Sequence, residues 1–295
     1  MAVVHRGFGL GRPGWRASLD VVRTVLIARL KIISRYKGSI FLEAFLPIVF
    51  AALPILLGAA IAGGSANAAD NFYANTGTTN YVLYMLVGSA TFMVVTIILW
   101  LIGYWVRREQ ETGTLESLYL APAKRYAVLA GVTTYAMIRG IAAFFLALVV
   151  GSLVFGVNPL TGNLLLAFAF LTLGLLPLWG IAFLFGAFIL RVKEANSVIQ
   201  LMQWVVAFLM GVYFPVTIFP AILQGIAVSF PPTVMNDGVR ASILDINTIF
   251  GPAPGGFYIS FAILFAMAVA APLIGYEAFL VAERRLKRRE GVGQF

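Results

Sequence analysis

Residues that carry enzyme chemistry are scarce in this sequence. It contains no cysteine, a single histidine (His5) and only 11% charged residues. The absence of cysteine excludes disulfides and thiolate metal sites, and one histidine in a Gly/Arg-rich tail cannot build a zinc site or a Ser/His pair. No Gly-Lys dipeptide and no H-E-x-x-H segment occur, which excludes the phosphate-binding G-x-x-x-x-G-K-[ST] loop and the zinc-protease helix. We therefore predict that the chain is not an enzyme and binds no metal or cofactor of its own.

Apolar residues are abundant instead. Hydrophobic side chains make up 61% of the 295 residues, and the mean hydropathy is +0.93. A soluble core of this size cannot hide so much apolar surface, so the chain is predicted to be an integral membrane protein. The first residues lack the apolar core and the small-residue cleavage site of a signal peptide, and we expect them to be retained.

The long apolar stretches predict the membrane spans. A helix needs about 20 mostly apolar residues to cross roughly 30 Å of hydrocarbon at about 1.5 Å per residue. We predict an all-α membrane protein with six spanning helices, of which the fifth is the shortest, in one domain at 40–282 between an N-terminal segment at 1–39 and a basic tail at 283–295. The predicted spans are residues 40–62, 81–106, 126–157, 164–190, 198–214 and 257–282.

The basic residues are distributed unevenly over the segments between the spans. Nineteen of the 21 lysines and arginines lie in the tail before Ile40, the insert at 107–125, the turn around Arg191 and the C-terminal tail, whereas the opposite side holds only Arg240. Cytoplasmic segments of membrane proteins are enriched in lysine and arginine. Both termini and the insert are therefore predicted to be cytoplasmic, in a multi-pass protein of the cell membrane.

Residues 17–37 have the pattern of an amphipathic helix. The basic residues of this segment fall mostly away from its apolar face. This favours a helix in the cytoplasmic membrane interface, with apolar side chains among acyl chains and cations near headgroups. The alternative is an ordinary solvated helix beside the membrane. The apolar residues at helical spacing are Leu19, Val22, Leu26, Leu30 and Ile33.

The segment at about 215–250 contains an apolar run that is too short to cross. This run, 218–230, has only thirteen residues and is flanked by prolines. We predict a re-entrant helical segment that dips in from the outer side and returns. It should pack against the other helices, because non-helical backbone at membrane depth must be buried in protein or face a wet cavity. A loop lying on the outer headgroups is the alternative.

Few ionisable residues fall within the predicted spans. Glu43 and Glu277 lie near the ends of the first and sixth spans and are expected to be boundary charges, whereas Arg139 is deeper. We predict a structural ion pair of Arg139 with Glu43 or with a carboxylate of the insert. A proton or substrate relay through Arg139 and Glu43 would instead indicate a secondary carrier or channel that works without ATP.

The charged insert between the second and third spans reads RREQETGTLESLYLAPAKR, residues 107–125, with four basic and three acidic residues. A helix that starts near Gly113 and ends at Pro122 places Leu115 and Leu118 on one apolar stripe. A helix of about two turns is not stable alone in water. Its apolar stripe is therefore predicted to bind a partner surface.

The same insert carries a family resemblance. EQETGTLESLYLAP, from Glu109 to Pro122, resembles the coupling-helix region of type-2 ABC exporter permeases. KEANSVIQLMQ, from Lys193, resembles the polar turn that enters the fifth span in that family, and GVYFPVTIFPAILQGIAVSFPPT, from Gly211, resembles its Phe-Pro turn and re-entrant helix pair. The resemblance covers most of residues 40–282.

This resemblance implies a transport function. A dimer of permeases would sit on two separate ATP-binding cassette subunits, which bind ATP and magnesium, and the coupling helix would transmit their closure. The second permease would be another copy or a related chain, and we expect membrane lipids but no nucleic acid as further partners. The implied contacts with the ATPase through the coupling helix are Glu109, Glu111, Thr112, Gly113, Thr114, Leu115, Glu116 and Leu118. The implied second cytoplasmic contact is formed by Arg191 and Glu194.

The sequence shows no charged substrate site. We expect an exporter of a hydrophobic or amphipathic small molecule, such as a drug, an antibiotic or a lipid-like compound, and a lipid-linked glycan is the alternative cargo. Ordinary helix packing would explain the candidate pathway residues of the second and fifth spans at least as well. These candidates are Thr91, Met93, Met202, Gln203, Phe208 and Phe214.

Overall fold

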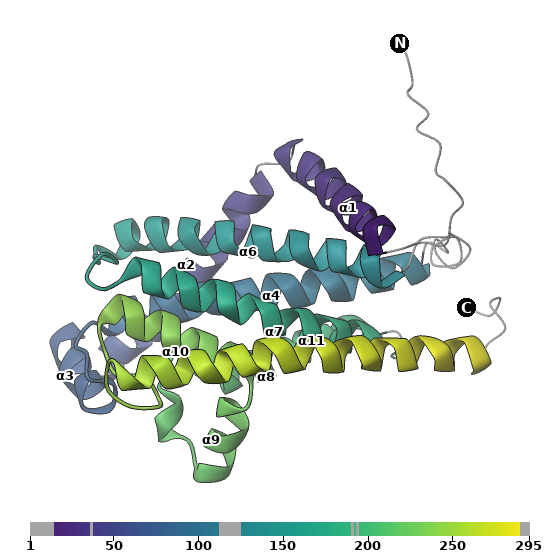
Figure 1. Cartoon of the computed structure of the whole chain (residues 1–295). Coiled ribbons are helices and arrows are strands. Elements are labelled where there is room, and N and C mark those ends of the chain that lie inside the picture. Colours follow the sequence, from purple (N-terminus) through teal and green to yellow (C-terminus); the bar gives the residue numbers. More distant parts are fainter. Residues whose placement is uncertain (1–14, 36–37, 112–124, 190–191, 193–194, 290–295) are drawn as a thin grey trace.

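A computed structural model describes residues 15–35, 38–111, 125–189, 192 and 195–289 of the protein. Nearly all of these residues are helical and no β-strand is found among them, which confirms the predicted all-α class. The helices in Figure 1 are α1 (Trp15–Arg35), α2 (Gly38–Ile61), α3 (Ser65–Thr76), α4 (Tyr81–Glu111), α6 (Arg125–Phe155), α7 (Leu164–Ile189), α8 (Ala195–Leu209), the 3-10 helix η1 (Val216–Ile218), α9 (Ala221–Val228), α10 (Pro231–Leu244) and α11 (Gly255–Arg289).

Four of the described helices are long and apolar enough to cross a membrane: α4, α6, α7 and α11. The residues Phe45–Ile61 of α2 pass the same test only together with α3, from which they are bent by 103°. α8 is a shorter apolar helix of 15 residues that ends at Leu209, whereas the sequence predicted a span at 198–214. The structure thus supports four or five spans by length, and the count of six stays a prediction.

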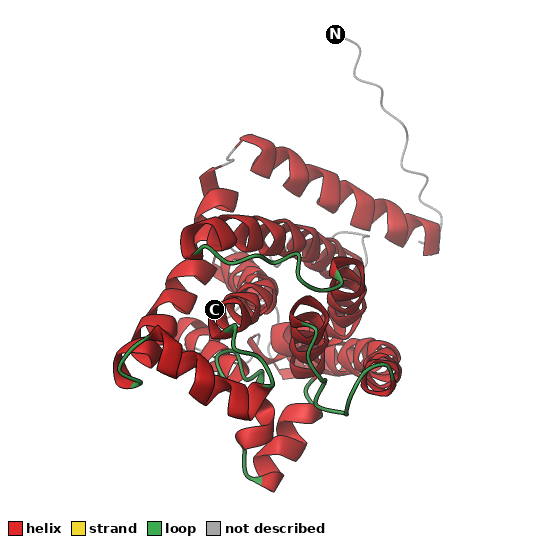
Figure 2. Ribbon diagram, turned by 90° about the vertical axis from the view of Figure 1, so that its left-hand side faces the viewer, coloured by secondary structure: helices red, strands yellow, loops and turns green. Residues whose placement is uncertain are grey.

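α4 is the central helix of the bundle. Within its most apolar stretch, 89% of the residues are buried inside the protein, whereas the corresponding share for α11 is 17%. α4 packs against α2, α6, α7, α8 and α10, while α11 packs mainly along α7. Viewed along the bundle, α1 and α9 project from it on opposite sides (Figure 2). A displacement of α4 would therefore change its contacts with most of the other helices.

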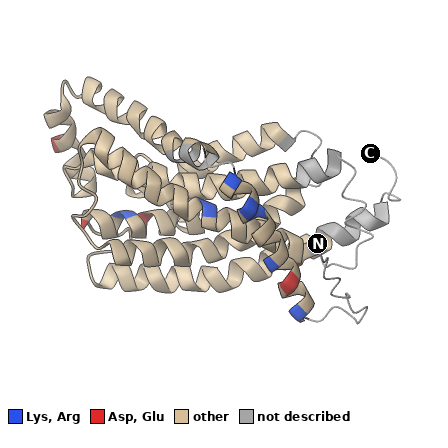
Figure 3. Cartoon of the chain, turned by 90° about the horizontal axis from the view of Figure 1, so that it is seen from above, with Lys and Arg blue, Asp and Glu red and all other residues tan. Residues whose placement is uncertain are grey.

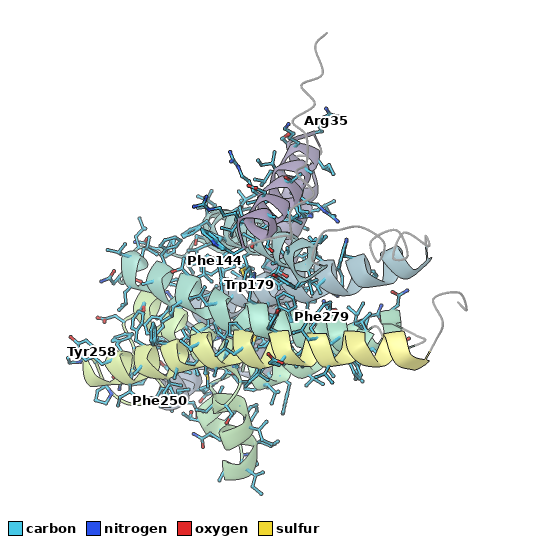
Figure 4. The ribbon with its side chains drawn as sticks, turned by 45° about the vertical axis from the view of Figure 1, so that its right-hand side comes forward. Arg35, Phe144, Trp179, Phe250, Tyr258 and Phe279 are labelled. Atoms are coloured by element: carbon cyan, nitrogen blue, oxygen red, sulfur yellow. The ribbon has the colours of Figure 1, made fainter. Side chains whose placement is uncertain are left out.

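α7 and α11 cross with their backbones in contact. A methyl group at Gly180 would collide with the carbonyl of Ala271 and the nitrogen of Pro272, and one at Gly275 would collide with the carbonyl of Gly180. Figure 4 labels one aromatic residue on each of these two helices, Trp179 on α7 and Phe279 on α11. Close approach of this kind is how membrane helices gain packing energy, since lipid gives them little hydrophobic reason to associate.

The amphipathic helix predicted at 17–37 is present as α1, and part of its apolar face lies on protein. A methyl group at Gly131 of α6 would lie 2.9 Å from Val25 Cβ and 3.1 Å from the carbonyl oxygen of Val22. Leu19 remains 55% exposed. Lysines and arginines gather in α1, whereas the coloured parts of the long helices carry few charged residues (Figure 3). Placement of the exposed side in the membrane interface stays a prediction.

A polar helix, α3, follows α2 between the first and second predicted spans. Its apolar side packs on the bundle through Phe72, whose ring lies 4.9 Å from that of Tyr84 and 6.2 Å from that of Tyr81. The helix ends at Gly77, which has a positive φ of 73° and donates its N–H to the carbonyl of Tyr73. α3 thus covers the start of α4.

Candidate functional site

Two of the predicted contacts with an ATPase, Glu109 and Glu111, lie at the end of α4. The backbone of Glu109 and Glu111 forms the last turn of α4, and α6 begins at Arg125. These two helix ends lie at the same end of the bundle (Figure 1). The other predicted contact residues fall outside the described part of the chain, namely Thr112, Gly113, Thr114, Leu115, Glu116, Leu118, Arg191 and Glu194.

The pathway candidates on α4 are enclosed by protein. Thr91 is fully buried and its hydroxyl donates to the carbonyl of Val87 in its own helix, at 2.9 Å. Met93 is buried in a small cluster with Ile97 and Ala143. Neither side chain faces a surface in this state of the protein, so a pathway role for them stays a prediction.

The candidates on α8 lie nearer the surface. Met202 and Gln203 are half-buried, and Phe208 is 47% exposed. Phe208 and Phe214 meet at a ring distance of 6.1 Å, and the ring of Phe219 lies 4.8 Å from Phe208 and 5.4 Å from Phe214. We call Phe208, Phe214 and Phe219 the aromatic cluster. The structure adds Phe219, which the sequence analysis did not select.

The proposed ion pair of Arg139 and Glu43 is not tested, since the side chain of Glu43 is outside the described residues. Arg139 is half-buried on α6 and its Nη1 donates to the hydroxyl of Tyr135 at 3.5 Å. Glu277 is exposed on α11, and its place at the membrane boundary stays a prediction.

The end of α8 is built by a glycine in the left-handed conformation. Gly211 has φ 58° and donates its N–H to the carbonyl of Phe208, while Val212 donates to the carbonyl of Ala207. This pair of bonds is the Schellman termination of a helix. It stops α8 at Leu209 and leaves the carbonyl oxygens of residues 209–212 beyond the helical ladder. In an apolar environment each such oxygen costs several kcal/mol unless it accepts a hydrogen bond.

Side chains of α10 supply a donor to each of these carbonyl oxygens. The donors lie three and four residues apart along the chain, so they share one face of α10. The hydrogen bonds run from Thr233 Oγ1 to Leu209 O (3.1 Å), from Asn236 Nδ2 to Met210 O (3.0 Å), from Arg240 Nη1 to Gly211 O (3.2 Å) and from Arg240 Nη2 to Val212 O (2.7 Å). We call these four bonds, with their donors and acceptors, the α8–α10 clasp.

Arg240 joins the clasp to α4. Its side chain is only 3% exposed, and the guanidinium carbon lies 3.6 Å from the ring centre of Tyr84. A methyl group at Gly88 of α4 would collide with Arg240 Nη2 and with the carbonyl of Val212. A cation stacked on an aromatic face is stabilised most when both are desolvated, as here. One buried arginine therefore holds together α10, the turn after α8, and α4.

The other end of α10 is anchored to the turn between α6 and α7. Thr161 donates its hydroxyl to the carbonyl of Ile243 at 3.0 Å, and Asn163 donates its N–H to the carbonyl of Ser242 at 2.7 Å. Asp237, one turn before Arg240, accepts the N–H of Ile249 at 2.9 Å and so fixes the loop toward α11. α10 thus connects the end of α8 to α4, to the turn between α6 and α7, and to the loop toward α11.

The sequence analysis missed the clasp. It treated Arg240 only as the single basic residue between the fifth and sixth spans. That isolation was the available signal, because a lone arginine beside Thr233 and Asn236 at helical spacing, in an apolar segment, needs buried acceptors. In the described residues no group of His, Cys, Asp or Glu side chains is arranged to hold a metal ion. The clasp holds the end of α8 against α10 and α4.

Comparison with known proteins identifies the family of the chain. The model of a family described as "ABC-2 family transporter protein" matches residues 56–276, about three quarters of the chain. The matched region runs from within α2 to within α11 and so includes the clasp and the aromatic cluster. A comparison with curated proteins found no significant match. The chain belongs to the ABC-2 family, the membrane permease components of ABC transporters.

Proposed function

We propose that this chain is the permease subunit of an ATP-driven exporter that moves a hydrophobic or amphipathic small molecule out of the cytoplasm. ABC-2 permeases work with ATP-binding cassette subunits. Two such subunits would bind ATP and magnesium and hydrolyse the ATP, and two permease chains, identical or related, would form the pathway. The permease itself supplies the membrane helices and the coupling contacts.

The observation that carries this proposal is the charged insert at 107–125 and its place in the fold. It connects α4, the most buried of the long helices, to α6, which packs along α4. A force applied to the insert by an ATPase would therefore reach the centre of the bundle through two covalently attached helices. The insert contacts proposed for this purpose are those at Glu109–Leu118, with Arg191 and Glu194 as a second contact.

The surface of α8 supports a permease dimer. α8 packs mainly on α4, and it leaves a stripe of large apolar side chains uncovered at helical spacing. Trp204 in this stripe is 68% exposed. A second permease subunit would cover this stripe and bring two aromatic clusters toward one pathway between the subunits. The other large exposed side chains of the stripe are Leu201, Val205 and Phe208.

The absence of a cluster of charged side chains around the α8 candidates, within the described residues, supports an apolar cargo. Met202, Phe208 and Phe214 offer flexible or aromatic contacts, and Gln203 offers a single amide. Thr91 and Met93 would join the pathway only after α4 separates from the helices that cover them. A lipid-linked glycan would need polar contacts for its sugar part, and this group of residues offers few.

Purification and reconstitution test the proposed function. We expect the permease to co-purify with an ATP-binding cassette protein when the two are expressed together. Reconstituted vesicles should then show export that requires Mg-ATP, and the permease alone should not transport under an ion gradient. A monodisperse permease that moves compounds under a proton or sodium gradient without the ATPase would refute the proposal and favour the secondary carrier built on Arg139 and Glu43.

Topology provides an independent prediction. Because the chain has no cysteine, single cysteines can be labelled without background. Ser117→Cys and Gly291→Cys should react with impermeant maleimides only from the cytoplasmic side, whereas Asn75→Cys, on the exposed side of α3, should react from outside. Exterior labelling at Ser117→Cys would overturn both the cytoplasmic termini and the coupling role of the insert.

A further inference from the structure

We propose that Arg240 is a positioning residue for transport, whose guanidinium fixes the turn after α8 against α4 and thereby sets where the aromatic cluster lies. The turn, residues 210–213, directly joins Phe208 and Leu209 at the end of α8 to Phe214. Two of the three rings of the aromatic cluster are thus attached to the segment whose carbonyl oxygens the arginine binds.

The geometry singles out Arg240 among the members of the α8–α10 clasp. Thr233 and Asn236 each donate to one carbonyl, while Arg240 donates to two, those of the successive residues Gly211 and Val212. A planar guanidinium with parallel donors holds two acceptors in a fixed relative orientation. Only this side chain of the clasp also stacks on α4, through Tyr84.

Few other contacts restrain the end of α8. Among the helices, α8 packs mainly on α4, and the side of α8 that carries Trp204 and Phe208 is exposed. α9, which follows the turn, projects from the bundle (Figures 1 and 2) and packs on η1 and α10. If Arg240 released the turn, Thr233 and Asn236 would still hold the end of α8 to α10, but the carbonyls of Gly211 and Val212 would lose their donors. The turn that joins Phe208 to Phe214 would then lose the link to α4 that Arg240 provides through Tyr84.

The close approach at Gly88 fits the same role. Since even a methyl group there would collide with the guanidinium and with the carbonyl of Val212, α4 leaves room for this contact alone. The Nε of Arg240 has no hydrogen-bond partner among the described residues, so the hydrogen bonds of the guanidinium are directed through its two Nη atoms to the turn. A buried arginine that served only as a charge would not require a residue without a side chain at position 88 of the neighbouring helix.

The positioning itself does not depend on the cargo or direction of transport; only its link to substrate handling rests on the proposed pathway role of Phe208 and Phe214. The test therefore measures position first. Val212→Cys, at a site that is 0% exposed, reports whether the turn is seated, and Leu171→Cys on α7, also 0% exposed, reports whether the bundle is intact. Both are labelled with a small maleimide on the full chain in native membranes.

We expect Arg240→Met, which keeps a long side chain but removes the donors, to raise the labelling rate of Val212→Cys by about tenfold or more. Leu171→Cys should stay protected in the same background. Arg240→Lys, which retains a cation over Tyr84 but lacks the planar pair of donors, should restore part of the protection. Unchanged labelling of Val212→Cys, or equal loss of protection at both sites, would overturn the proposal, the second because it would show general unfolding.

A second variant covers the case in which Arg240→Met does not accumulate in the membrane. Tyr84→Leu removes the ring under the guanidinium and leaves every donor of the clasp in place, so labelling of Val212→Cys should rise by a smaller factor, about threefold. Tyr84→Phe keeps the ring and should match the unmodified chain. Equal labelling rates for Tyr84→Leu and Tyr84→Phe would show that α4 does not seat the turn through Arg240, and would refute the inference while leaving the ATP-driven reading untouched.

Discussion

Replacing Gly180 by leucine should leave little folded protein in the membrane. A side chain at this position would meet the carbonyl of Ala271 and the nitrogen of Pro272, and the reciprocal position, Gly275, faces the carbonyl of Gly180. These neighbours are backbone atoms, which cannot rotate away as a side-chain end can. Overpacking of a core costs about 1–3 kcal/mol even when side chains adjust, so a clash with backbone should reach or exceed the upper end of that range.

The measurement is thermal unfolding of the detergent-solubilised protein, followed by fluorescence detection after size exclusion. Gly58→Leu is the matched control, since Gly58 also lies inside an apolar helix, α2, but a side chain there would meet no atom within 4 Å. We expect the control to match the unmodified protein and Gly180→Leu to unfold at a much lower temperature or to aggregate. Equal stability of the two variants would show that α7 and α11 do not depend on backbone contact.

The helices themselves were predictable because their signal is local. Long apolar runs bounded by charged or turn residues define a spanning helix whatever surrounds it, and α4, α6, α7 and α11 begin within two residues of their predicted starts. The fifth predicted span failed at its end. Gly211 stands inside an apolar run, where glycine is common in membrane helices, so nothing local distinguished a helix-ending conformation from continuation.

The α8–α10 clasp could not be predicted in the same way because its acceptors are backbone carbonyls, which every residue has. The side-chain donors at 233, 236 and 240 indicate that buried acceptors are needed. The sequence does not show that these acceptors belong to residues 24 to 29 positions earlier. The docking of α1 on Gly131 was missed for a related reason. The amphipathic pattern gives an apolar face, and both lipid and a neighbouring helix satisfy it.

The second large effect is expected at the insert, where Leu118→Asp should abolish ATP-driven export without unfolding the permease. Leu115 and Leu118 fall on the apolar stripe of a helix that the sequence predicts to be too short to hold alone, so most of their contact energy should lie with the ATPase. A carboxylate in a desolvated socket without a partner costs about 2 to 5 kcal/mol. At about 1.4 kcal/mol per tenfold, this lowers the affinity for the ATPase by a factor of about 30 to 4,000.

Ser117→Asp is the matched control for this variant, because it adds the same charge to the adjacent residue, which a helical arrangement places away from the stripe. Both variants should insert and unfold at the temperature of the unmodified permease. Leu118→Asp should fail to retain the ATPase in pull-down and should leave hydrolysis unresponsive to transported compounds in vesicles, whereas Ser117→Asp should keep both. If Leu118→Asp exports normally at ordinary ATPase concentrations, the insert is a solvated loop. The force that reaches α4 would then have to enter through another cytoplasmic contact, of which Arg191 and Glu194 are the remaining candidates.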